Sequence, residues 1–180
     1  MDLILVRHPQ PDIAPGLCYG RTDVAASAQA IAGVAQSLRD TGLPGGLPLY
    51  ASPLKRCAEL AAQFDVPVRL DARLAEMDFG AWEMRPWDAI ARTEVEAWSA
   101  DLLHYRPGGG ENVLDAARRV AAFRDELRQA GHPRALVICH AGAMRLLAAL
   151  HAGGTLEEAA LRAAAQPHRI DYGGIVVLKD

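Results

Sequence analysis

The most telling stretch of this sequence is Leu3-Ile4-Leu5-Val6-Arg7-His8-Pro9, four apolar residues closed by an Arg-His pair and a proline. A short apolar run without polar alternation is typical of a strand buried on both faces of a central sheet. Pro9 has no amide hydrogen to give to a sheet ladder, so we expect the strand to end before it. Arg7 and His8 then stand at the carboxyl end of a central strand, the edge where open α/β sheets bind ligands.

A second apolar run, Ala135-Leu136-Val137-Ile138-Cys139, has the same design and ends at His140. We expect it to form another central strand with a histidine at its carboxyl end. Shorter strands are expected at 49–51, 66–70 and 175–178, with helices between the strands. The helix expected over 83–105 carries Trp87 and Trp98, which we assign to a small satellite core and not to a cofactor site.

The composition limits the kinds of partner. A chain of 180 residues with 51% hydrophobic residues suits one domain with a sizeable core. A formal charge of -3 offers no basic surface, so we expect no nucleic-acid partner. No apolar stretch is long enough for a signal peptide or a membrane span. The three cysteines, Cys18, Cys57 and Cys139, lack the spacing of metal ligands and favour a reducing compartment. We therefore expect a cytoplasmic protein without a membrane partner.

Ser52-Pro53 predicts the start of a helix, because serine is a favoured N-cap and proline is favoured at the first helical position. Arg56 then falls in the first turn, where the helix macrodipole disfavours a cation. An anion held between Arg56 and the helix N-terminus would explain this position. The alternative is a solvated surface arginine.

Two arginines, two histidines and a glutamate stand where they can meet in one cleft: Arg7, Arg56, His8, His140 and Glu76. A zinc site is an alternative, but an arginine beside each ligand would repel the cation, so we expect no metal. The sequence has no G-x-S-x-G and no Walker A motif, and the glycines of Pro107-Gly108-Gly109-Gly110 lack the preceding strand of a dinucleotide site.

Five motifs follow one another along the chain: Leu5-Val6-Arg7-His8, Ser52-Pro53-Leu54-Lys55-Arg56, Leu74-Ala75-Glu76-Met77-Asp78-Phe79-Gly80-Ala81-Trp82-Glu83, Gly109-Gly110-Glu111 and Cys139-His140-Ala141-Gly142. In this order and spacing they resemble the histidine phosphatase (phosphoglycerate mutase-like) superfamily over nearly the whole chain. The loop Cys18-Tyr19-Gly20-Arg21-Thr22-Asp23 is most similar to the α-ribazole phosphatase branch.

The resemblance implies an α/β fold, a three-layer sandwich in which helices flank a mostly parallel central sheet. It implies a single histidine phosphatase domain over residues 1–180, with a small helical insertion at about 83–106. The sequence departs from the family pattern at Pro9 and Met84, where the family usually has glycine, and at Pro11 and Ala14. These departures concern the substrate rim.

The resemblance also implies roles for the five core side chains. His8 would be the nucleophile that becomes phosphohistidine, and Glu76 would be the proton donor to the leaving group. Arg7, Arg56 and His140 would hold the phosphoryl oxygens. No cofactor would be needed.

The implied function is a phosphomonoesterase that acts on α-ribazole 5'-phosphate or its cobamide precursor in adenosylcobalamin synthesis. Tyr19, Arg21 and Thr22 would bind the substrate, although a helix cap at Asp23 and its ion pair with Arg21 are an alternative. The other functions left open are a phosphoglycerate mutase, a broad-specificity phosphatase and, from another class, a non-catalytic phosphate-binding module. The expected partner is a small phosphorylated metabolite, and a homodimer is compatible with this expectation.

Overall fold

The computed structural model describes residues 1–43, 45–165, 167 and 169–180, and it is built on a five-stranded sheet. The strands are β1 (Asp2–Arg7), β2 (Leu49–Ala51), β3 (Val68–Leu70), β4 (Arg134–Cys139) and β5 (Ile175–Leu178). Their order is β3-β2-β4-β1-β5, and only β5 runs antiparallel to its neighbour. The mostly parallel central sheet expected from the sequence is confirmed.

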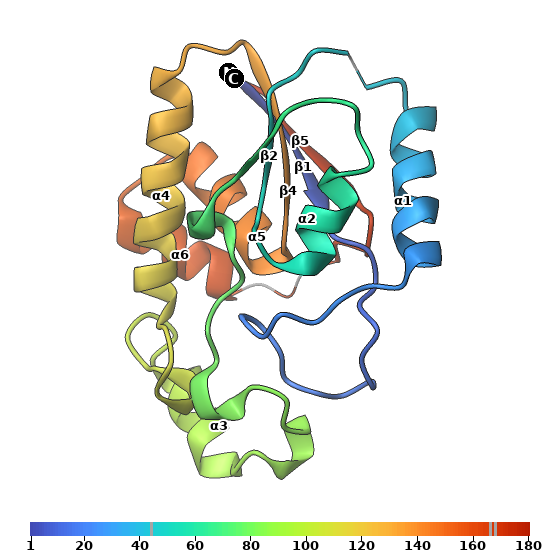
Figure 1. Ribbon diagram of the computed structural model, residues 1–180. Coiled ribbons are helices and arrows are strands. Elements are labelled where there is room, and N and C mark those ends of the chain that lie inside the picture. The colour runs from blue at the N-terminus through green and yellow to red at the C-terminus, as the bar shows by residue number, and fades with distance from the viewer. Residues whose placement is uncertain (44, 166, 168) are drawn as a thin grey trace.

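Helices cover both faces of this sheet (Figure 1). One face carries α1 (Ala28–Asp40) and α2 (Lys55–Ala61). The other face carries α4 (Val113–Gln129), α5 (Ala141–His151) and α6 (Leu156–Ala165). The remaining helix, α3 (Arg92–Ala100), lies beyond the end of the sheet at which the parallel strands finish (Figure 1).

Strand β1 is apolar on both sides because both faces of the sheet are covered. Leu3 and Leu5 pack in the core with α4, α5 and α6, whereas Ile4 and Val6 pack in the core with α1 and α2. Alternate side chains of a strand point to opposite faces, so an unbroken apolar run is the pattern that a doubly covered strand requires.

The prediction of one continuous helix over 83–105 is wrong. Only α3 is α-helical there, and Trp87–Ala89 forms a short 3₁₀ turn. The backbone of Met84 and Arg85 is paired instead with Cys18, whose carbonyl accepts from Met84 and whose amide donates to Arg85. A peptide group engaged in this way cannot join a helix ladder, and Pro86 also disfavours helical geometry at the residue before it.

The satellite core expected for this segment includes Trp98 but not Trp87, whose side chain is exposed. Trp82, Ile90 and Cys18 are buried there, and Trp98 packs against them. This cluster fixes α3 beside the carboxyl ends of the strands, where it borders the pocket described next.

Candidate active site

His8 and His140 come together because β1 and β4 are neighbours in the sheet. Arg7 pairs in register with Cys139, so each histidine is the first residue beyond its strand. The amide of His8 donates to the carbonyl of Cys139 at 3.0 Å, which continues the parallel ladder past the end of β1. The two imidazole centroids lie 5.0 Å apart.

The ring of His8 is held in one orientation by the residue that follows it. Its Nδ1 lies 2.7 Å from the carbonyl oxygen of Pro9. A carbonyl only accepts hydrogen bonds, so the neutral ring carries its proton on Nδ1 and keeps a lone pair on Nε2. Burial, together with the charges of Arg56 and Arg7, lowers the pKa of His8 from 6.5 to about 3, and the hydrogen bond to the Pro9 carbonyl acts in the opposite direction. His8 is therefore a neutral base or nucleophile at neutral pH.

We expect His8 to make the protein less stable in acid. Its folded-state pKa lies below its unfolded-state value, so the unfolded chain binds the extra proton first as the pH falls below 6.5. Between pH 7 and about pH 4.5, this single group should cost about 2–3 kcal/mol of the free energy of unfolding. Urea unfolding of the native protein and of His8→Asn at both pH values measures how much free energy of unfolding each protein loses as the pH falls, and the native protein should lose more. Equal losses of stability in the two proteins would contradict the neutral, buried state of His8.

Arg56 is fully buried, so the solvated surface alternative is wrong. Its Nη2 donates to the carbonyl of Gly20 at 2.6 Å and its Nη1 donates to that of Thr22 at 2.9 Å. Arg7 donates from Nη1 to the carbonyl of Ile170 at 2.6 Å. Among the described residues, the Nε of neither arginine has a hydrogen-bond partner. Two fixed guanidiniums therefore keep buried N–H groups available for an anion beside His8.

The helix near Arg56 begins later than expected. α2 starts at Lys55 with Leu54 at the N-cap position, and Ser52 does not cap it. The hydroxyl of Ser52 lies 2.8 Å from Nε2 of His140, which is also fully buried. Burial and the neighbouring charges hold the pKa of His140 well below its usual range. The sequence did not reveal Ser52 as the partner of His140, because a serine followed by proline is also the usual pattern of a helix N-cap.

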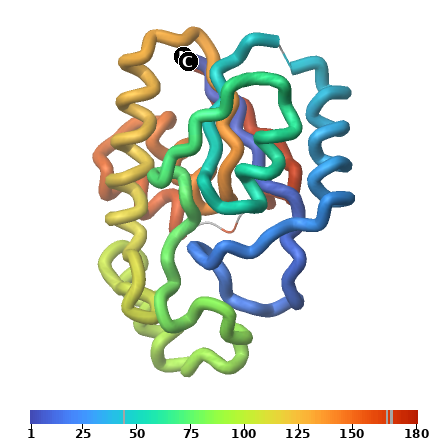
Figure 2. The backbone as a smooth tube through the Cα atoms, viewed as in Figure 1, coloured from blue at the N-terminus to red at the C-terminus, as the bar shows by residue number. Residues whose placement is uncertain are grey.

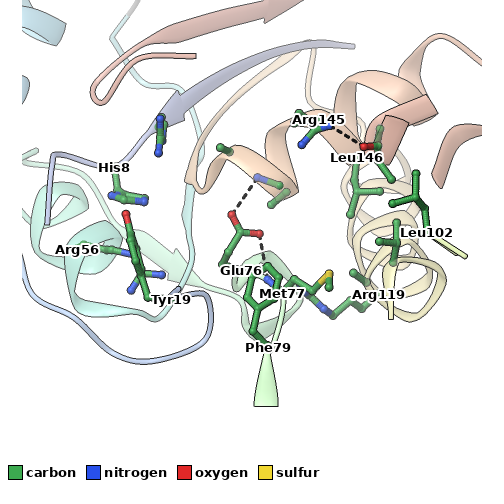
Figure 3. Close-up of a pocket in the computed structure, with 18 of the residues that line it drawn as sticks. His8, Tyr19, Arg56, Glu76, Met77, Phe79, Leu102, Arg119, Arg145 and Leu146 are labelled. Carbon is green, nitrogen blue, oxygen red and sulfur yellow. Dashed lines mark hydrogen bonds between the residues drawn. The ribbon is translucent and has the colours of Figure 1, made fainter. Parts of the chain in front are cut away.

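Glu76 enters the site from the turn after β3, and it is anchored at both oxygens (Figure 3). Oε2 accepts from the amide of Gly142 at 2.9 Å, and Oε1 accepts from the amide of Met77 at 3.0 Å. A Cβ atom at Gly142 would lie 2.2 Å from Oε1, so only glycine leaves room for the carboxylate here. Because α5 begins at Ala141, directly after His140, its first turn can hold Glu76 in this way.

The loop after β1 folds back under the sheet to the segment that carries Glu76 (Figure 2). Glu83 fastens it, since its carboxylate accepts from the amides of Gly20, Arg21 and Thr22 and from the Thr22 hydroxyl. Burial alone would raise the pKa of Glu83, but these donors, with the amide of Phe79, hold it below its ordinary value. Glu83 is the residue that positions the loop, and its role was not read from the sequence.

The three residues expected to bind the substrate, which are Tyr19, Arg21 and Thr22, lie in different places. Tyr19 lines the pocket, whereas Arg21 and Thr22 are not among the residues that line it. Arg21 lies 3.7 Å from the carboxylate of Asp78. Asp23 accepts from the amide of Lys55 at 2.7 Å, so it caps α2 and not the helix that follows it.

The pocket that joins these groups has a volume of about 410 Å³. His8, Arg7 and Arg56 line one end, and Glu76 lies between that end and an apolar lobe (Figure 3). Apolar side chains form most of the lobe, and they come from α3 to α6 and from the loops before and after α3; among them are Phe79, Trp98, Leu102, Leu146 and Ala164. Arg145, Arg119 and Tyr172 also line the pocket, and no sequence pattern singled them out.

The described residues show no cluster of three or more His, Cys, Asp or Glu side chains arranged for a metal ion. In the same part of the chain, no helix has the length and apolar character needed to cross a bilayer.

Comparisons with known proteins agree on one family. The family model described as histidine phosphatase superfamily (branch 1) matches residues 3–173. An adenosylcobalamin/alpha-ribazole phosphatase of Escherichia coli is 32% identical over 158 residues, which cover 82% of this chain and 77% of that protein. The crystal structure of an alpha-ribazole phosphatase from Shigella flexneri is similar with a TM-score of 0.81 and 28% identity, covering 99% of this chain and 90% of the other. A mycobacterial glucosyl-3-phosphoglycerate phosphatase is similar with a TM-score of 0.75 and 26% identity, over 91% and 83% of the two chains.

Proposed function

This chain belongs to branch 1 of the histidine phosphatase superfamily and is a phosphatase, and we propose that it hydrolyses a small phosphate monoester through a phosphohistidine at His8. The observation that carries the proposal is the state of His8, a buried neutral imidazole whose Nδ1 is held by the Pro9 carbonyl and which lies under the influence of the charges of Arg56 and Arg7. A protein that only bound phosphate would gain more from a protonated imidazole than from a neutral one.

In the first step, Nε2 of His8 forms a bond to phosphorus while the bond to the ester oxygen breaks. Arg7 and Arg56, which line the pocket with His8, stabilise the charge that the phosphoryl oxygens carry in the transition state. His140 does not line the pocket, but its ring lies 5.0 Å from that of His8, and in this proposal it is the third group that holds these oxygens. Glu76 gives its proton to the departing oxygen. In the second step, water gives a proton to the Glu76 carboxylate and attacks phosphorus, and the bond to His8 breaks to release phosphate.

For the leaving group, we propose the ribose and base of α-ribazole 5'-phosphate or of its cobamide precursor. Two findings support this choice. Relatives with α-ribazole phosphatase names cover most of this chain. The lobe beyond Glu76 is walled by Trp98, Leu102 and Leu146, which suit a flat apolar ring better than a small hydrophilic acid.

A second candidate substrate follows from Arg145, which is half-buried in the same lobe. A guanidinium there is suited to a substrate carboxylate, as in a phosphoglycerate. Transfer of the phosphoryl group back to such a substrate would make the protein a mutase instead of a phosphatase.

A substrate panel separates these candidates. We expect kcat/KM for α-ribazole 5'-phosphate to exceed that for ribose 5-phosphate and 3-phosphoglycerate by about 10- to 100-fold, because burial of a ring in the lobe adds about 1.5–3 kcal/mol of binding. Steady-state phosphate release with each ester measures these ratios. A preference for 3-phosphoglycerate, or its isomerisation without phosphate release, would overturn the ribazole assignment.

A further inference from the structure

Tyr19 and Tyr172 meet across the phosphoryl end of the pocket, although they come from opposite ends of the chain. Their hydroxyl oxygens lie 2.8 Å apart. Tyr19 belongs to the loop after β1, and Tyr172 belongs to the turn before β5. The amide of Gly173 donates to the carbonyls of Arg7 and His8, which fixes that turn against the end of β1.

Each ring also packs on one of the two arginines. The guanidinium carbon of Arg7 lies 3.9 Å from the ring centre of Tyr172, and that of Arg56 lies 5.5 Å from the ring centre of Tyr19. The rings of His8 and Tyr172 have centroids 5.6 Å apart. Figure 3 shows the hydroxyl of Tyr19 directed toward the imidazole of His8. The two hydroxyls therefore lie beside the position that a phosphoryl group on His8 would occupy.

Two hydroxyl groups have two protons, and their mutual hydrogen bond uses one. The second proton belongs to whichever hydroxyl acts as the acceptor, and it stays available as a donor. Burial and the bond to Tyr172 raise the pKa of Tyr19, so its hydroxyl keeps its proton at neutral pH. An anionic oxygen placed between the pair and His8 is the natural acceptor for that proton.

We propose that Tyr19 and Tyr172 act as one shared hydrogen-bond donor to the transferred phosphoryl group. This inference rests on the proposed phosphoryl transfer to His8. Either hydroxyl can supply the donor, because the other accepts from it when both are present. With one tyrosine removed, the proton of the remaining hydroxyl is no longer used in the pair and can still reach the phosphoryl oxygen.

The test is a double-mutant cycle with Tyr19→Phe, Tyr172→Phe and the double variant, measured with p-nitrophenyl phosphate. Phenylalanine keeps the ring on each arginine and removes only the hydroxyl. We expect each single variant to lose less than about 3-fold in kcat/KM and the double variant to lose about 10- to 100-fold, the effect of one hydrogen bond to a charged group. The inhibition constant of inorganic phosphate should rise in the double variant and change little in the single variants.

Other roles of the pair give different patterns. If the bond between the hydroxyls only held the loop to the C-terminal turn, each single variant would lose as much as the double variant, and the proposal would be wrong. A double loss equal to the product of the single losses, or a loss confined to one tyrosine, would also overturn it. Tyr50→Phe removes a hydroxyl that contacts Arg69 outside this pocket and is the matched control. Labelled phosphate on His8 of the native protein verifies the underlying mechanism independently of the cycle.

Discussion

Rapid alkaline quenching during turnover should trap acid-labile phosphate on His8 of the native protein, and His8→Ala should trap none. Removing a nucleophile that acts together with its neighbours should lower kcat by at least about 10⁴-fold. We expect a large effect because the Pro9 carbonyl holds Nδ1 of the neutral His8 ring, which leaves the lone pair on Nε2 to attack phosphorus near the charges of Arg7 and Arg56. Single-turnover mixing with ³²P-labelled substrate, followed by peptide mapping, identifies the labelled residue.

The matched control is His104→Ala, because His104 is an exposed histidine that does not line the pocket. This variant should keep its phosphoenzyme and its turnover. Label on a serine, or turnover of His8→Ala within about 10-fold of the native rate, would rule out the phosphohistidine mechanism. Circular dichroism of His8→Ala verifies that the loss of activity is not a loss of the fold.

The second large effect is expected from Arg56→Ala. The guanidinium is fully buried, its Nε–H has no partner among the described residues, and Arg56 lines the same pocket as His8. Its removal should cost about 2–5 kcal/mol of transition-state stabilisation, or about 30- to 5,000-fold in kcat/KM. Arg56→Lys should recover only part of this loss, since an ammonium is a point charge and cannot bind two oxygens as a planar fork.

Arg56 also supports the loop after β1 through its bonds to Gly20 and Thr22, so stability must be measured together with activity. The lysine variant keeps a cation at this position, and its melting temperature shows whether the loop is still held. Arg92→Ala removes an exposed arginine of α3 and should leave kcat/KM unchanged. Unchanged kcat/KM in folded Arg56→Ala would exclude a role for Arg56 in holding the phosphoryl group.

The sequence by itself determined the central strands and the residues at their ends. The runs that end at Arg7-His8 and at His140 are apolar at every position, and a helix or a half-exposed strand would not need that pattern. A strand that is buried on both faces of the sheet accepts almost only apolar residues, so such strands can be recognised from their own short stretch of sequence. The order and spacing of the motifs around them were sufficient to identify the family.

Only the tertiary structure decided which groups are neighbours. Nothing local in the sequence places β4 beside β1, brings Ser52 to His140, or sets Tyr172 against Tyr19. These contacts join residues more than eighty positions apart, and they depend on strand order and on where turns return the chain.

The same reason explains the errors at the ends of helices. A capping serine and a helical spacing are local preferences worth about 1 kcal/mol, and long-range hydrogen bonds override them. Ser52 bonds to His140 instead of capping α2, and the backbone of Met84 pairs with Cys18 instead of extending a helix. The sequence could therefore indicate the side chains that we propose for the chemistry, while the fold decided their partners, because those partners are chosen by competition over the whole chain.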